Sequence, residues 1–94
     1  MVVGVLELAL AIPAITLKEK RSVVKRVVHR TRTKFNVAVA EVDELDNAEA
    51  AVIGVVAVGN DRRHVNSMLD HVATFVDDLG LCELVDESLT LEHY

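Results

Sequence analysis

The sequence predicts an α+β fold in which four antiparallel strands form one sheet and two helices cover one of its faces. Three observations support this prediction. Four segments have apolar residues in the pattern of strands, two segments have the ~3.6-residue period of helices, and their order along the chain is strand–helix–strand–strand–helix–strand. The chain has 94 residues, enough for one domain spanning residues 1–94, and 51% of them are hydrophobic and supply its core.

The first half of the chain is predicted to contain two strands and the first helix. Residues 2–12 form an apolar strand that stops at a proline, which lacks the amide hydrogen for strand pairing. Thr16 and Glu19 then form a capping-box pattern, which predicts a helix over residues 17–34. Residues 36–43 are expected to form the second strand, followed by a polar turn.

The second half of the chain repeats this pattern. Residues 48–59 form a third strand that is apolar on both faces. Asn60 is a suitable N-cap for a second helix over residues 61–79, and Gly80 stands where helices commonly end. Residues 81–91 are expected to form the fourth strand.

This order of elements has an economical arrangement, the ferredoxin-like sandwich with strand order 4-1-3-2. The first and third strands then lie in the centre, and both helices cover one face of the sheet. The other face is left open and apolar, and monomers seldom expose such a patch to water. We therefore expect a homodimer through the open sheet face, although a covering C-terminal segment is an alternative. The expected interface residues are Val3, Val5, Glu7, Ala9, Glu41, Ile53, Val55 and Ala57.

The net charge of −5 conceals a strong asymmetry along the chain. Residues 18–34 hold eight of the ten Lys and Arg residues and one acid, a local charge of +7, whereas the remainder carries −12. Such a polarity produces a local field that attracts anions. On a helical wheel, four of the basic residues fall within about 60° of one another and two more lie further round the exposed side. These candidate RNA-binding or anion-binding residues are Lys18, Arg21, Lys25 and Arg32, then Arg26 and Arg30.

Several segments of the sequence carry a resemblance to a known family. They are Leu-Lys-Glu-Lys-Arg at residues 17–21, Val-Val-Lys at 23–25, Phe-Asn-Val-Ala-Val-Ala-Glu-Val-Asp at 35–43, and Asn-Asp-Arg-Arg-His-Val at 60–65. Together they resemble the YlxP-like family of small bacterial cytoplasmic proteins, a domain of unknown function. The resemblance covers essentially the whole chain and implies a ferredoxin-like fold. It transfers no activity, and only the frequent proximity of such genes to translation genes favours a role with RNA.

Other kinds of chemistry find little support in the sequence. The first and third strands contain no aromatic residue, which excludes base stacking on the sheet. His64 and His71 are seven residues apart and cannot chelate one ion as an i, i+4 pair does. The single cysteine, Cys82, lacks a neighbouring base motif, and Glu7 and Glu41 are expected about 10 Å apart on the open face. We expect no catalytic residue, no metal and no cofactor.

The function that we expect is therefore non-enzymatic. The protein is predicted to be cytoplasmic, with no membrane association because its uncharged runs hold at most eleven residues. Its predicted partner is RNA or a ribonucleoprotein, ribosome-associated, bound through the basic helix. Two alternatives remain open: a homodimeric regulatory module with a small ligand near Glu7 and Glu41, or an adaptor that docks a protein on its open sheet. The simplest explanation of the basic residues is that they form a solvated helix face without a ligand.

Overall fold

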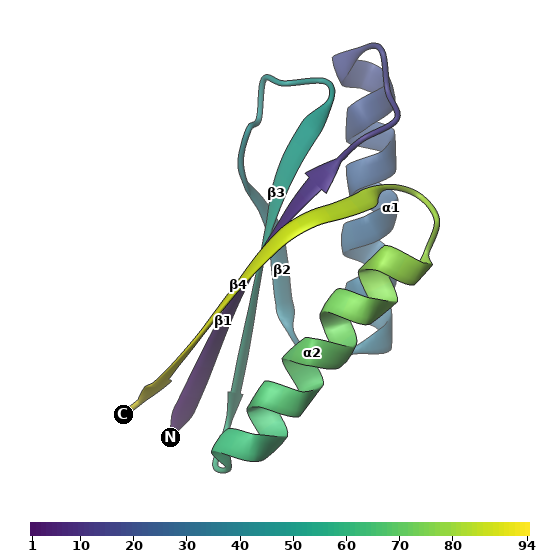
Figure 1. The fold of residues 1–94 in the computed structure, drawn as a ribbon. Helices are drawn as coiled ribbons and strands as arrows, with labels where there is room; N and C mark the ends of the chain where they lie inside the picture. The colour runs from purple at the N-terminus through teal and green to yellow at the C-terminus, as the bar shows by residue number, and fades with distance from the viewer.

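The computed structural model describes residues 1–94, which form one four-stranded antiparallel sheet with two helices on the same side (Figure 1). The sheet order is β2-β3-β1-β4, which is the predicted order 4-1-3-2 written from the other edge. The predicted ferredoxin-like α+β fold is thus confirmed. The elements are β1 (Val2–Ala11), α1 (Leu17–Lys34), β2 (Ala38–Asp43), β3 (Ala50–Gly59), α2 (Arg62–Asp78) and β4 (Glu83–His93). Neither helix is both long enough and apolar enough to cross a membrane.

The turn between β2 and β3 is longer than predicted, so β3 starts two residues later than expected. The amide of Glu49 donates to Oδ1 of Asn47 at 2.9 Å, and the amide of Asn47 donates to the carbonyl of Glu44 at 3.1 Å. Asn and Asp side chains commonly replace a backbone partner in this way. These local bonds keep residues 44–49 out of the β ladder.

Helix α1 begins where the capping-box pattern predicts. The amide of Glu19 donates to Oγ1 of Thr16 at 3.2 Å, and Oε2 of Glu19 accepts from the amide of Ile15 at 3.3 Å. The second bond thus reaches one residue further back than in a standard capping box. Both bonds satisfy amides that have no partner inside the helix.

Helix α2 is capped by Asp61, so the prediction that Asn60 caps it was wrong. Oδ1 of Asp61 accepts from the amides of Arg63 at 2.8 Å and His64 at 3.4 Å. Asp and Asn cap equally well, but a carboxylate is also stabilised by the positive end of the helix dipole. At the other end Gly80, with φ of 72°, adopts the left-handed conformation that commonly follows a helix.

The hydrophobic core lies between the helices and the sheet and includes Leu6, Leu8 and Leu10 of β1. Helix α2 approaches β1 closely because Gly4 has no side chain. A Cβ atom at Gly4 would lie 2.7 Å from Cγ1 of Val65, closer than carbon atoms pack. The glycine therefore sets the distance between α2 and the sheet.

The open face of the sheet differs from its prediction at three positions of β3. Ile53, Val55 and Ala57 are buried against the helices, so their predicted placement on the open face was wrong. Residues directly opposite in an antiparallel pair share a face, and β1 pairs Val5 with Val56 rather than with Val55. Because both faces of β3 are apolar, its sequence pattern did not distinguish the covered face from the open one.

Candidate functional site

All six predicted RNA-binding or anion-binding residues are exposed on α1. Lys34, in the last turn, is exposed as well, so seven cations of this helix reach solvent. Their helical positions place them in two rows on either side of the helix. We call the first row the basic ridge (Lys18, Arg21, Lys25 and Arg32) and the second the inner row (Arg26, Arg30 and Lys34).

The basic ridge lies on the side of α1 that faces the outer edge of β2. Nη2 of Arg32 donates to the carbonyl of Val39 at 3.0 Å. This bond satisfies a carbonyl on an edge strand, where unpaired backbone groups otherwise attract other chains. A guanidinium group has five N–H donors, so most of those of Arg32 remain for another partner. The bond therefore positions Arg32 within the ridge.

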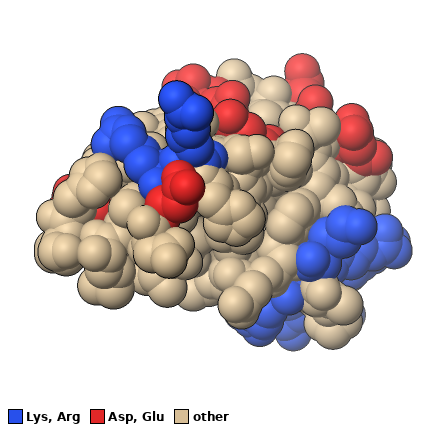
Figure 2. All heavy atoms as spheres, turned by 90° about the horizontal axis from the view of Figure 1, so that it is seen from below, with Lys and Arg blue, Asp and Glu red and all other residues tan.

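None of these seven cations is neutralised by a carboxylate of the chain. The single salt bridge of the chain within 4.0 Å joins Lys20 to Glu41, although the chain holds fifteen Asp and Glu residues. Figure 2 shows Lys and Arg in two separate groups in the view from below. The Lys and Arg residues outside α1 are Arg62 and Arg63, at the start of α2. The positive charge of α1 is thus segregated and free to act on a ligand.

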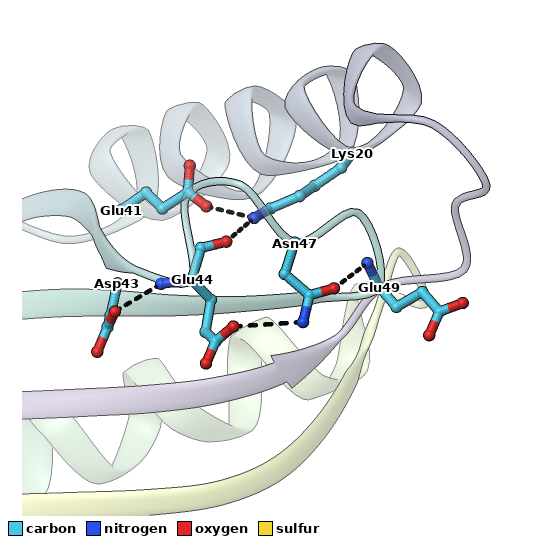
Figure 3. A network of polar contacts seen from close by, with 6 residues as sticks. All are labelled: Lys20, Glu41, Asp43, Glu44, Asn47 and Glu49. Carbon is cyan, nitrogen blue, oxygen red and sulfur yellow. Dashed lines mark hydrogen bonds and ion pairs between the residues drawn. The ribbon is translucent and has the colours of Figure 1, made fainter.

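Lys20 is the exception on α1, because its side chain is fully buried. Nζ of Lys20 donates to the carbonyl of Glu44 and lies 2.9 Å from Oε2 of Glu41 (Figure 3). Oε2 of Glu41 therefore has an ionic contact with Lys20 but no hydrogen-bond partner. Lys20 was not among the predicted site residues, although its wheel position beside the buried stripe of Val24 and Val27 was a signal of burial.

The ion pair also corrects the predicted position of Glu41. Glu41 lies on the helix-covered side of the sheet, opposite Ile53 in the ladder, whereas Glu7 is exposed opposite Gly54. The prediction that both carboxylates share the open face was wrong. A small ligand held between them is no longer compatible with this geometry, because the sheet itself separates the two side chains.

Lys20 connects the turn of residues 44–49 to the start of α1. Glu44 has a positive φ of 60°, and its amide donates to Oδ1 of Asp43 at 2.8 Å. Non-glycine residues adopt this conformation infrequently, and the surrounding contacts must stabilise it. The lysine therefore holds the turn of residues 44–49 and orients the first turn of α1, which carries Lys18 and precedes Arg21.

The predicted interface residues of β1 do lie on the open face. Val3 pairs with Val58 and Val5 pairs with Val56 in the β1–β3 ladder, so the four side chains form a contiguous block. We call this block the valine patch. Val58 is 63% exposed and Val5 is 37% exposed, and no segment of the chain covers them. Glu7 and Ala9 continue the same face along β1.

The remaining reactive groups do not assemble into a site. No three His, Cys, Asp or Glu side chains are grouped as ligands of a metal ion. The thiol of Cys82 is half-buried, and this burial, followed by the charge of Asp77, raises its pKa above the ordinary value. A thiol whose pKa is raised stays protonated at neutral pH and is a weak nucleophile.

Comparison with known proteins agrees with the resemblance seen in the sequence. A family described as "Protein of unknown function (DUF503)" matches residues 3–89. The chain belongs to the DUF503 family. The uncharacterized protein YlxP of Bacillus subtilis (strain 168) is 37% identical to this DUF503 protein over 62 residues, which are 66% of this chain and 67% of YlxP. The family and the YlxP-like resemblance are thereby established.

Proposed function

We propose that this DUF503 protein binds RNA, or a particle of RNA and protein, through the basic ridge of α1 and catalyses no reaction. One observation carries the proposal. Seven cations of one helix are exposed and unpaired in a chain whose net charge is −5. A surface with such a local field attracts a polyanion even though the whole molecule is acidic.

The arrangement of these cations is unfavourable for the isolated helix. Lys18 lies in the first turn of α1, where the helix dipole disfavours a positive charge by about 0.3–1 kcal/mol, and Arg21 follows directly after that turn. Like charges one turn apart add a repulsion of a few tenths of a kcal/mol per pair. A bound polyanion offsets both terms, because its phosphates neutralise the row.

The dimensions of the ridge agree with contacts to a nucleic-acid backbone. From Lys18 to Arg32 it extends about 21 Å along the helix axis, at ~1.5 Å per residue. Contacts of Lys and Arg with phosphates position a nucleic acid without reading its bases. The proposed interaction is therefore with the shape and charge of the RNA. The open sheet face is a poor alternative for RNA, because β1 and β3 have no aromatic residues for base stacking.

The proposal is tested by a pair of double charge reversals with the same change in net charge. Arg21→Glu with Lys25→Glu is expected to abolish retention of RNA from a cell lysate. Arg62→Glu with Arg63→Glu, at the start of α2, is expected to leave it intact. Retention must disappear after nuclease treatment, and thermal unfolding must show that both variants are folded. RNA binding that survives the α1 double reversal would refute the proposal.

We also propose that a second copy of the chain covers the open sheet. The valine patch supports this, since burying its exposed side chains contributes about 25 cal/mol for each Å² removed from water. The patch contains no charged residue, and Glu7 lies next to it. A two-fold contact centred on the valines therefore keeps the Glu7 carboxylates of both copies at the rim of the interface. Sedimentation equilibrium tests the proposal, and a protein that stays monomeric at millimolar concentration would exclude it.

A further inference from the structure

A groove runs between the C-terminal parts of α1 and α2, beside the inner row of cations. Its volume is about 550 Å³, which lies within the roughly 300–1,000 Å³ of typical ligand sites. Helix α1 contributes four residues to its lining, α2 contributes one, and the residue that directly follows α2 is the sixth. They are His29, Arg30, Thr33 and Lys34, and Phe75 and Leu79.

The groove combines an apolar floor with a basic rim. Phe75 and Leu79 are half-buried and form the floor, whereas Arg30 and Lys34 are exposed at the rim. No carboxylate lines the groove. The ligand class that matches this chemistry has a flat apolar part joined to a negative charge.

The aromatic ring of the floor is held in place by a second ring. The centroids of Phe35 and Phe75 lie 5.4 Å apart with the rings at 82°, an edge-to-face contact, and Phe35 itself does not line the groove. These are two of the three aromatic residues of the chain: Phe35 follows the last residue of α1, and Phe75 lies on α2. Phe35 fixes the ring of Phe75, and the groove leaves that ring accessible. A second flat group can therefore stack on Phe75.

We propose that this groove holds one unpaired nucleotide of an RNA strand, with its base against Phe75 and its phosphate between Arg30 and Lys34. The inference rests on the proposed function and adds that the bound RNA is single-stranded at this point. Arg26 continues the inner row one turn further, about 6 Å along the axis, where it meets the neighbouring phosphate. An acidic peptide would match the cations but would leave the aromatic platform without a role.

The test uses a single-stranded oligoribonucleotide with one 2-aminopurine, whose fluorescence falls when it stacks, and a fully paired duplex as comparison. The wild-type protein is expected to quench the fluorescence on binding. Phe75→Leu, which keeps the apolar floor, is expected to remove the quenching and weaken binding of the strand at least about fivefold. Binding of the duplex is expected to remain unchanged, because the basic ridge contacts its phosphates.

A second pair of variants keeps the test valid if Phe75→Leu unfolds. The hydroxyls of Thr33 and Thr74 are both exposed and bond to the carbonyl four residues earlier, at 2.8 Å and 3.2 Å. Thr33 lines the groove and Thr74 does not. Thr33→Glu is therefore expected to remove the quenching, while Thr74→Glu is expected to retain it.

The outcomes separate this inference from the proposed function. The charge reversal at Arg21 and Lys25 could abolish binding of both RNAs while the Phe75→Leu and Thr33→Glu proteins still quench the 2-aminopurine fluorescence. In that case the groove assignment is wrong and the proposed function stands. If neither RNA binds the wild-type protein, both are wrong. Adenosine monophosphate or an acidic peptide that displaces the strand at equal concentration would also overturn the assignment to an RNA strand.

Discussion

Nζ of Lys20 lies 2.9 Å from Oε2 of Glu41, and this ion pair joins the first turn of α1 to β2 beside the turn of residues 44–49 (Figure 3). The lysine side chain is 1% exposed and that of Glu41 is 16% exposed. Seven cations of the same helix are exposed and unpaired. One lysine of α1 is thus part of the structural framework, and the others are available to a ligand.

The buried pair predicts a large effect of removing Lys20 on stability. Lys20→Met leaves the carboxylate of Glu41 and the carbonyl of Glu44 without their partner, and breaking a buried pair costs about 3–5 kcal/mol. We expect the low end of this range, because Glu41 retains some contact with water. Urea denaturation measures the free energy of unfolding.

Two further variants make this prediction specific. Lys20→Met combined with Glu41→Gln is expected to recover part of the loss, since no unpaired charge remains. The exposed control Lys18→Met is expected to change stability by less than about 0.5 kcal/mol. A Lys20→Met protein as stable as the wild type would show that the ion pair contributes little.

Binding through the basic ridge predicts a steep dependence on salt. Four phosphate contacts give a slope of about −3 to −4 in a plot of log K against log salt concentration. The affinity for RNA should therefore fall roughly 60- to 250-fold between 50 mM and 200 mM salt. Fluorescence anisotropy with a labelled RNA measures this slope. A slope near zero would argue against phosphate contacts altogether.

If a second copy of the chain covers the valine patch, the substitution Val58→Glu is expected to weaken the dimer. Val58 is 63% exposed, so the change is tolerated in the monomer but places a charge inside the dimer contact. We expect the dimer dissociation constant to rise about a hundredfold, since a buried unpaired polar group costs several kcal/mol. The control is Ile15→Glu, at an 88% exposed position between β1 and α1, outside the sheet. Equal effects of the two substitutions in sedimentation equilibrium would count against the patch.

The hydroxyl of Tyr94 is expected to titrate with a raised pKa, and the absorbance of the tyrosine itself reports this titration. It donates to Oε2 of Glu92 at 2.7 Å, and this bond, followed by the charge of the carboxylate, raises the pKa of Tyr94 above its usual value of 10.0. A raised pKa means that the contact stabilises the fold below pH ~10 and that this contribution is lost as the pH rises through the raised pKa.

The chain has one tyrosine and no tryptophan, so absorbance at 295 nm follows this group alone. Glu92→Ala is expected to return the pKa of Tyr94 toward its usual value. Removing another carboxylate of β4, in Glu87→Ala, is expected to leave it raised. An unchanged titration in Glu92→Ala would mean that the hydrogen bond does not form in solution.

Some elements followed from local sequence alone. Thr16 and Glu19 marked the start of α1, and the apolar period and Gly80 marked the body and the end of α2, because caps and helical periodicity act over a few residues. The segregation of charge between residues 18 and 34 was also evident, since it depends only on composition. These features predicted the fold class and the basic surface of α1.

Other features depended on contacts between distant segments. The residues of β3 have apolar side chains on both faces, so only pairing with β1 decided that Ile53 and Val55 enter the core while Val56 remains exposed. Cross-strand register is a relation between two strands, and a slip of one residue exchanges the two faces.

The sequence by itself determined the elements, their order and the positive charge of α1, because these depend on neighbours along the chain. Only the tertiary structure decided that Lys20 is buried against Glu41 and that Phe35 supports Phe75 beside the inner row. In both cases the partners come from different elements, and the packing of the helices on the sheet and on each other brings them together.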